Sequence, residues 1–388
     1  MSMSAQAIAP PSFWHPGRRA VGIWLLVIAL MIAAMVTIGG LTRLTGSGLS
    51  ITEWDPIMGA IPPLNAHDWQ DAFAKYQKIP QYIHENQGMS LDAFKGIFWW
   101  EWTHRLLGRL IGVVFFVPFV FFAWRGAIGR EDIPRMVVLF LLGALQGFVG
   151  WWMVESGLEV RVSVSQYRLA LHLGVALILL LAILWTALEY LRDFPPPERG
   201  RTRADGEQVG VAQQTYEQDP SPDRFAIHPS LSKGGMIFVA LVYAQMLLGA
   251  LVAGLHAGLI YNTWPSMDGR AFPEGAFSGA PWWRNFFENP GLAQFDHRIG
   301  AYVVGLSALA LWIGGRRARI SGWARTTGNL VLAIVIVQIA LGIATLLNQA
   351  PLVLSALHQA TAVALLSAAL WHAYELRNAH QSAAAFSA

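Results

Sequence analysis

Four of the 11 histidines stand at matching places, each near the start of a long apolar run. They are His104, His172, His297 and His358. A single histidine near the end of an apolar helix is usually a hydrogen-bonded or interfacial residue. Four in equivalent places are a stronger signal, because ionisable side chains at this depth normally face the interior of a bundle and carry function. We therefore expect all four at a similar depth, near the outer face of a membrane.

Two imidazoles that face each other from opposed helices could hold a metal. Such a pair is a poor zinc site, because no cysteine or carboxylate completes the four ligands that zinc usually takes. Haem iron instead takes one axial imidazole on each face of the ring, and the space between the helices of a bundle admits a flat macrocycle. Arg105 and Arg298 each directly follow one of the histidines, so they are candidates to bind haem propionates. The alternative is that both arginines extend to lipid headgroups.

Glu101 precedes His104 by three positions, so the two side chains share one face of a helix. A carboxylate inside an apolar helix is costly unless it is paired or used. One interpretation is a salt bridge to Arg105, one turn further along. The other is a group that handles a proton or stabilises charge beside whatever His104 binds. The matching position of the second half is the neutral Gln294, so a chemical role for Glu101 would place the chemistry in the N-terminal half.

The elements that must position these residues are membrane-spanning helices. The 388 residues are 54% hydrophobic and 13% charged, with a mean hydropathy of +0.42, which excludes a soluble enzyme, a disordered chain and a fibrous one. Eight apolar runs are long enough to cross a bilayer as helices. These runs lie near 21–40, 97–124, 136–154, 169–191, 234–256, 294–314, 329–348 and 352–374. The predicted fold class is an all-α membrane protein with eight transmembrane helices.

Composition also limits the chemistry and the partners. The chain has no cysteine, which removes disulfides, thiolate metal sites, iron–sulfur clusters and thiol nucleophiles. The net charge is +3, and the basic residues form short clusters beside the apolar runs, so we expect no nucleic-acid partner. The bilayer is the partner that this composition predicts.

The loops indicate orientation and domain organisation. With the N-terminus inside, the inner segments hold most of the 27 Lys and Arg residues, which favours cytoplasmic termini at 1–20 and 375–388. The first run is too long for a removable signal peptide and is interpreted as a retained anchor. Residues 41–96 form an outer segment with a surface helix over 65–81, whose Trp69, Phe73 and Tyr76 lie on one side. Residues 192–233 are rich in proline and charge and are interpreted as a flexible cytoplasmic linker.

The two halves of the chain look like copies of one unit. E-W-T-H-R opens the second run and Q-F-D-H-R opens the sixth, a glutamine lies four residues before a glycine in the third and seventh, and L-H opens the fourth and eighth. Both halves begin on the same side, so the repeat is parallel. It predicts two pseudo-symmetric four-helix bundles, 21–191 and 234–374, each with a site in its core.

These features resemble the haem A synthase family. The resemblance is carried by the eight spans, the duplicated four-helix unit, E-W-T-H-R-L-L-G-R, F-D-H-R-I-G and the two L-H pairs. It covers about Thr37 to His372 and leaves out the N-terminus, the linker and the tail. The E-x-x-H-R and F-D-H-R-I-G motifs in this order are fairly specific, whereas the L-H pairs are not.

The resemblance implies a role for each site residue. His297 and His358 would be axial ligands of a haem b cofactor. His104 and His172 would be axial ligands of the substrate haem, and Glu101 would be catalytic. The implied activity is oxidation of the C8 methyl group of haem O to a formyl group by successive hydroxylations and loss of water, which gives haem A for cytochrome oxidase.

The same resemblance implies surroundings and partners. A chain without cysteine is similar to the proteobacterial and mitochondrial branch of the family, and the short segment before the first run shows no clear transit peptide, which favours a bacterial inner membrane. Haem O would be delivered from haem O synthase, and haem A would pass to the cytochrome oxidase assembly machinery. The electron acceptor is not identified, and a homo-oligomer is left open.

Two other functions compete with this interpretation. A dihaem transmembrane b-type cytochrome that exchanges electrons with quinone would carry ligand pairs about 14 residues apart on each of two helices. Here His358 and His372 have that spacing, but Pro118, Thr186 and Leu311 stand 14 positions beyond the other three histidines. A transporter is the second alternative, since parallel repeats are common there, but it leaves the four matched histidines unexplained.

Overall fold

The computed structural model describes residues 17–55, 58–159, 161–192 and 229–387. Eight of its helices are long and apolar enough to cross a membrane, which confirms the predicted fold class. In chain order they are α1 (Arg18–Leu44), α4 (Leu91–Trp124), α5 (Ile133–Glu155), α6 (Gln166–Arg192), α7 (Pro229–Gly254), α9 (Pro290–Arg317), α10 (Gly322–Leu347) and α11 (Leu352–Ser387). The shorter elements are η1 (Met58–Ala60), α2 (Ala66–Tyr76), α3 (Pro80–His84), η3 (Ala257–Leu259), η4 (Trp282–Arg284) and α8 (Asn285–Glu288).

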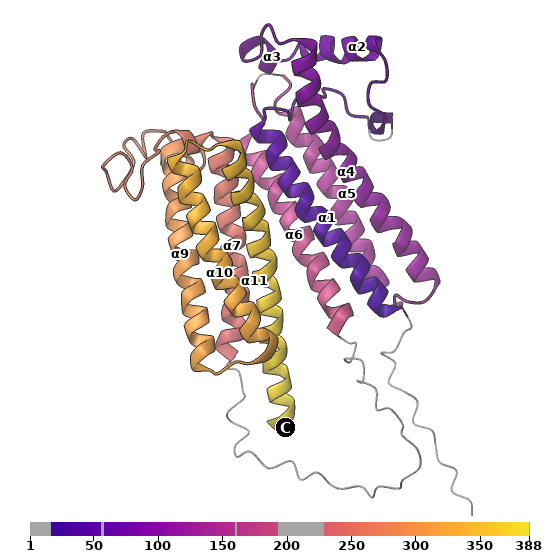
Figure 1. Ribbon diagram of the computed structural model, residues 1–388, viewed down its shortest axis with the longest axis vertical. Helices are drawn as coiled ribbons and strands as arrows, with labels where there is room; N and C mark the ends of the chain where they lie inside the picture. Colours follow the sequence, from indigo (N-terminus) through magenta and orange to yellow (C-terminus); the bar gives the residue numbers. More distant parts are fainter. Residues whose placement is uncertain (1–16, 56–57, 160, 193–228, 388) are drawn as a thin grey trace, which may run out of the picture.

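The long helices stand in two groups of four (Figure 1). In the first group α1, α4, α5 and α6 pack in ring order, and α7, α9, α10 and α11 do the same in the second. As a result α4 lies diagonally opposite α6, and α9 lies diagonally opposite α11. The groups meet where α1 and α6 pack against α7 and α11. This arrangement places the four helices that carry the predicted ligands in two diagonal pairs.

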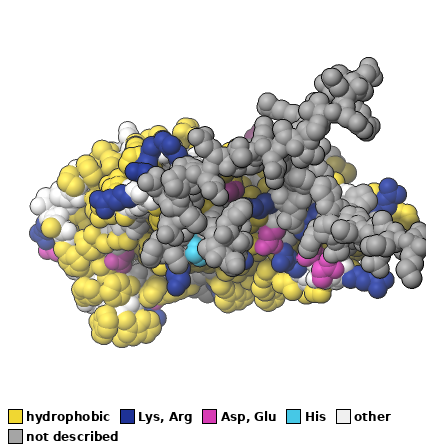
Figure 2. Space-filling view, turned by 90° about the horizontal axis from the view of Figure 1, so that it is seen from below, with side chains coloured by type: hydrophobic (Ala, Val, Ile, Leu, Met, Phe, Trp, Pro, Cys, Tyr) yellow, Lys and Arg dark blue, Asp and Glu magenta, His cyan; other side chains and the backbone are white. Residues whose placement is uncertain are grey.

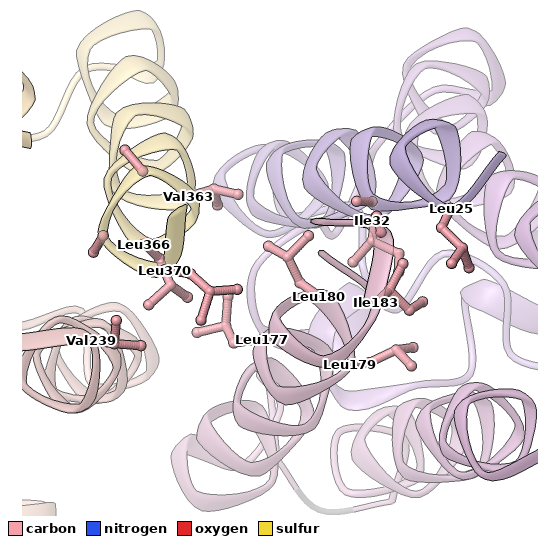
Figure 3. Close-up of a cluster of buried hydrophobic side chains, with 14 of the residues drawn as sticks. Leu25, Ile32, Leu177, Leu179, Leu180, Ile183, Val239, Val363, Leu366 and Leu370 are labelled. Atoms are coloured by element: carbon pink, nitrogen blue, oxygen red, sulfur yellow. The ribbon is translucent and has the colours of Figure 1, made fainter. Parts of the chain in front are cut away.

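A shared apolar core joins the two groups (Figure 3). Leu177 of α6, Val239 of α7 and Leu370 of α11 converge where the groups meet. All three side chains are at most 5% exposed. Because lipid tails are as apolar as leucine, this contact is stabilised by close packing rather than by removal of apolar surface from water. The junction holds the two groups of helices together.

The surface helix predicted over 65–81 begins where expected but is shorter. Asn65 caps α2 by accepting a hydrogen bond from the amide of Asp68 at 3.0 Å. The helix ends at Tyr76, and a separate helix, α3, starts at Pro80 because the residue before a proline is driven to extended backbone. The predicted apolar side is confirmed, since Trp69, Phe73 and Tyr76 pack in a cluster with Phe94 and Phe98 of α4.

Several helices extend beyond the apolar runs. α4 starts at Leu91 rather than near 97, capped by the Ser90 side chain, so His104 lies well inside it instead of in its first turn. α6 and α9 also start a few residues early, at Gln166 and Pro290, whereas α11 starts at Leu352, where its run was expected. α11 continues through the segment predicted as a tail, to Ser387. Hydropathy reports the apolar stretch, whereas a capped helix continues into polar surroundings as long as its backbone hydrogen bonds are made.

One end of the molecule carries many of the basic residues. Figure 2 shows this end, where α1 begins and α11 ends, with Lys and Arg side chains beside the hydrophobic flanks. Arg18, Arg192 and Arg317 are terminal residues of α1, α6 and α9 here. The flanks expose large apolar side chains such as Leu30, at 71%, and Leu306, at 68%, which suits contact with lipid. Most of the predicted linker, 193–228, and the N-terminal residues 1–16 lie outside the described residues.

Candidate functional site

The four predicted histidines occur at the same end of the two helix groups. His104 lies on α4 and His172 on α6, while His297 lies on α9 and His358 on α11. Each pair therefore stands on diagonally opposed helices of one group. Every imidazole packs against a helix that runs in the opposite direction, in the last two turns of that helix. The structure thus brings the residues together in the two pairs that the repeat predicted, at one level of the molecule.

The C-terminal pair has the geometry of two axial ligands. The ring centres of His297 and His358 lie 6.4 Å apart, with an angle of 84° between the ring planes. Metal–nitrogen bonds of about 2.0 Å on either side of one ion would separate two imidazole centres by roughly 6 Å. The two residues fit the binding of one haem iron between them.

Glycines leave room for the imidazoles of the N-terminal pair. A Cβ atom on Gly39 of α1 would stand 2.8 Å from Cε1 of His104, and one on Gly150 of α5 would stand 2.8 Å from Cε1 of His172. The Nδ1 atom of His104 is buried and has no hydrogen-bond partner among the described residues. These observations fit a site for a planar ligand held from two sides.

The C-terminal pair repeats the arrangement. A Cβ atom on Gly249 of α7 would stand 3.1 Å from Cε1 of His297, and one on Gly342 of α10 would stand 2.9 Å from Cε1 of His358. The sequence analysis noted Gly150 and Gly342 only as landmarks of the repeat. It did not single out Gly249, although Gln245 precedes it by the same four residues, a spacing that could have identified it.

Glu101 is held in an ion pair. Its side chain is buried, and its Oε1 atom lies 2.6 Å from Nη2 of Arg105. Its Oε2 atom accepts hydrogen bonds from the Ser50 hydroxyl and the Ile51 amide, both at 2.8 Å. The salt bridge that the sequence analysis considered is therefore present. These donors supply the compensation that a buried carboxylate requires, and they fix the carboxylate on the helix that carries His104.

Arg105 also fastens the outer loop to α4. It donates from Nη2 to the carbonyl of Ile51 at 2.6 Å and from Nη1 to the carbonyl of Glu53 at 2.8 Å. Its side chain is 13% exposed, so it turns to the loop rather than to headgroups. Its guanidinium is thus engaged by the carboxylate and by two backbone carbonyls.

Arg298 does the same for the second half. It donates to the carbonyls of Tyr261 at 3.0 Å and Ser266 at 3.2 Å, and to Oε1 of Gln294 at 3.2 Å. Gln294 in turn donates to the carbonyl of Tyr261 at 3.2 Å. The neutral Gln294 and the charged Glu101 thus occupy corresponding places beside an arginine that binds an outer loop. Both arginines lie next to the ligands as predicted, and their contact with propionates stays a prediction.

At the outer end of the junction, α1 reaches the second group of helices. Arg43 donates a hydrogen bond to the carbonyl of Ala253, and its Nη2 atom lies 3.5 Å from Nε2 of His256. Burial, and then the charge of Arg43, lower the pKa of His256, which lies in the loop after α7. This histidine is therefore held neutral beside a cation and contributes to packing between the groups.

The described residues contain no group of three or more His, Asp or Glu side chains placed to hold a metal ion. Each histidine pair offers two imidazoles. Two imidazoles are enough to ligate a haem iron, because the macrocycle occupies the other positions.

Residues 22–370 match the model of a protein family described as cytochrome oxidase assembly protein. The chain belongs to this family. The match runs through all eight long helices, so the chain is a multi-pass membrane protein of this family.

Relatives match nearly the whole length of the chain. The chain is 44% identical to the heme A synthase of Parvibaculum lavamentivorans, over 92% of this chain and 94% of that protein. It is 48% identical to the heme A synthase of Maricaulis maris, over 93% and 97%. It is 49% identical to the heme A synthase of Rhodopseudomonas palustris strain BisA53, over 90% and 88%. The resemblance found in the sequence is confirmed, and neither the b-type cytochrome nor the transporter gains support.

Proposed function

We propose that this protein is a haem A synthase, which oxidises the C8 methyl group of haem O to a formyl group by successive hydroxylations. The observation that carries this proposal is the presence of two histidine pairs at one level, the second with ring centres 6.4 Å apart, in a chain whose relatives over nearly the full length are named heme A synthase. One pair serves a resident cofactor and the other serves the substrate.

The C-terminal pair, His297 and His358, would bind haem b. Bound between these two residues, haem b would supply one-electron redox chemistry. His104 and His172 would hold the iron of haem O, which orients the porphyrin and presents its methyl group. The allocation rests on Glu101, because the half that carries a charged group beside its ligands is the half suited to chemistry.

Glu101 acts as a fixed negative charge beside the reacting group. The carboxylate cannot swing away, because Arg105, Ser50 and the amide of Ile51 hold both of its oxygens. A preorganised charge of this kind stabilises positive charge that develops at the methyl carbon, and it can accept a proton from it. The electrostatic role is favoured, since donors from Arg105, Ser50 and Ile51 already occupy both oxygens.

The membrane placement follows from the basic end of the molecule. Arg18, Arg192 and Arg317 lie at the end away from the histidine pairs. By the positive-inside rule this end faces the cytoplasm, so both termini are cytoplasmic and both pairs lie near the periplasmic face of the inner membrane. Haem O, too apolar for water, would enter from the bilayer after release by haem O synthase.

Extraction of the pigment from purified protein tests this function. The protein is produced together with haem O synthase, and its haems are separated by chromatography. Haem B together with haem O, hydroxylated haem O or haem A is the expected result. Haem B alone would favour the b-type cytochrome, and a protein without pigment would favour the transporter.

A further inference from the structure

Two of the four histidines are held by a glutamine side chain on the neighbouring helix. Nε2 of Gln146 lies 3.0 Å from Nδ1 of His172 and donates to the carbonyl of His172 at 3.0 Å. Nε2 of Gln245 lies 3.0 Å from Nδ1 of His297 and donates to the carbonyl of His297 at 2.8 Å. Each glutamine stands one turn before the glycine that faces the same ring. The amide therefore fixes both the ring and the backbone of the residue it contacts.

The third histidine has the same partner at longer range. Nε2 of Gln338 lies 3.5 Å from Nε2 of His358. Its Oε1 atom is buried and unpaired within the described residues, as are those of Gln146 and Gln245. A histidine that binds a metal through Nε2 carries its proton on Nδ1, and the hydrogen bond from Nδ1 sets the orientation of the ring. Rotation of the side-chain amide can turn its oxygen toward that proton. The Oε1 atom of each glutamine can therefore accept a hydrogen bond from Nδ1 of a metal-bound histidine.

The fourth histidine lacks this anchor. Met35 of α1 stands four residues before Gly39, which faces His104, and its Cε atom would lie 3.0 Å from a Cβ on Gly108 of α4. Gln245 holds the corresponding place, packed against Gly300 on the helix that carries His297. A thioether sulfur is only a weak acceptor.

The Nδ1 atom of His104 finds no partner in the part of the chain that the structure describes, and neither does the Nδ1 atom of His358, whose glutamine lies nearer to Nε2. Met35 therefore stands where the other three helices have a glutamine, four residues before the glycine that faces the histidine.

We propose that these glutamines are positioning residues for the axial histidines and that their uneven distribution makes one site permanent and the other exchangeable. At the C-terminal site a glutamine lies near both histidines, 3.0 Å from Nδ1 of His297 and 3.5 Å from Nε2 of His358. At the N-terminal site a glutamine lies beside His172, whereas Met35 holds the matching position four residues before Gly39. This inference rests on the proposed function, in which the N-terminal site must release its product after every reaction cycle. Loss of a partner hydrogen-bonded to a metal-bound histidine weakens metal binding by about 10–100-fold, so one missing anchor is enough to separate the two sites.

A polar side chain inside a membrane helix is costly unless it has a use. If the three glutamines only filled space, apolar residues of similar size would pack better in the bundle, as Met35 does. All three lie against a histidine. The polar contact, rather than the volume, is therefore the property to test.

The first test replaces the missing anchor. Purified protein that contains haem B and is loaded with haem O is mixed with excess apomyoglobin, and the release of each haem is followed by chromatography. Met35→Gln is expected to slow the release of haem O about tenfold or more, with the release of haem B unchanged. Met35→Leu is the matched control and should release haem O at the wild-type rate. An unchanged rate in Met35→Gln would overturn the inference.

The second test changes an existing anchor in two directions. Gln245→Leu should speed the release of haem B about tenfold or more and raise the midpoint potential of this haem. Gln245→Glu offers a stronger acceptor to Nδ1 of His297, which makes the imidazole more basic and should lower the potential. A residue that merely fills space would not move the potential in opposite directions. Shifts of the same sign, or none, would contradict the positioning role.

The two proposals fail in different ways. A protein that binds haem B but takes up no haem O refutes both the proposed function and the exchangeable site. A protein that binds and converts haem O, but whose Met35→Gln variant behaves as wild type, keeps the proposed function and loses the exchangeable site. The experiment on Gln245 requires haem B alone, so it tests the anchor even where the activity is absent.

Discussion

At the scale of single residues, each imidazole occupies space that a glycine on the neighbouring helix leaves free. A methyl group on Gly150 would stand 2.8 Å from Cε1 of His172, closer than two carbon atoms pack, so the ring has to move. The ring of His172 cannot move without breaking its contact with Gln146. The four ligands are thus sensitive to substitutions on helices that carry no ligand themselves.

Gly150→Ala should therefore empty the N-terminal site. Overpacking costs about 1–3 kcal/mol, and about 1.4 kcal/mol corresponds to a tenfold loss of affinity. The haem O content of the purified protein, measured by chromatography, is expected to fall about tenfold, while haem B is retained. Gly147→Ala, on the same helix with open space around it, is the control and should leave both haems in place. Normal haem O content in Gly150→Ala would contradict the close contact.

Glu101→Gln should abolish most of the turnover without emptying the sites. Loss of a group that stabilises charge or accepts a proton typically costs about 10²–10⁴-fold in rate. The variant should fold, because Gln294 beside Arg298 already shows that an amide is accepted at the corresponding place. Conversion of haem O is measured together with the content of both haems. Full turnover with normal loading would remove Glu101 from the chemistry.

At the scale of elements, one turn of α1 joins the two sites. Gln359, next to His358 on α11, donates to the carbonyl of Val36 at 2.7 Å. Gly40 lies against the Gln359 amide, and a Cβ on Gly40 would overlap it. The preceding residue, Gly39, faces His104. Adjacent glycines of α1 thus contact a ligand of one site and the neighbour of a ligand of the other.

Gly40→Ala should loosen the junction between α1 and α11. An added methyl group in this contact is expected to cost about 1–3 kcal/mol, seen as a lower Tm in detergent. The double variant Gly40→Ala/Gln359→Ala should recover part of the loss, since it removes the overlapping amide. Gly112→Ala, which has no neighbouring atom within 4 Å, should keep the wild-type Tm. Equal Tm values for the Gly40 and Gly112 variants would refute this packing.

At the scale of the whole molecule, the two groups of helices stand side by side (Figure 1). Their histidine pairs lie at the end opposite the basic end, which Figure 2 shows. The proposed substrate and cofactor sites therefore lie on the same side of the membrane as the loops that bind Arg105 and Arg298. Because every long helix crosses the membrane, successive loops lie on opposite sides of it. The orientation can be measured directly, because the natural chain has no cysteine and any introduced one is unique.

Single cysteines should report this orientation. Glu274 lies in the loop before α9 on the histidine side, and Glu131 lies in the loop between α4 and α5; both are exposed. Glu274→Cys is expected to react with a membrane-impermeant maleimide in cells whose outer membrane has been permeabilised. Glu131→Cys should react only after the inner membrane is broken. The reverse pattern would invert the topology.

The eight helices and the pairing of the histidines could be predicted from the amino-acid sequence alone. A bilayer forces apolar runs to become helices, and a repeated unit folds as its copy does, so His104 with His172 and His297 with His358 could be paired before any coordinates were known. The ion pair between Glu101 and Arg105 was also accessible, because residues four apart meet on a helix. Helix ends were less accurate, as the early start of α4 at Leu91 shows, because caps and outer packing extend a helix beyond its apolar stretch.

Contacts between residues far apart in the chain needed the folded molecule. Neither the hydrogen bonds from Ser50 and Ile51 to Glu101 nor the approach of Gly39 to His104 leaves a trace in local periodicity. Such contacts depend on how far one helix is shifted and turned against another. That register is set by side-chain packing over the entire interface, and it brings the glutamine amides to His172 and His297.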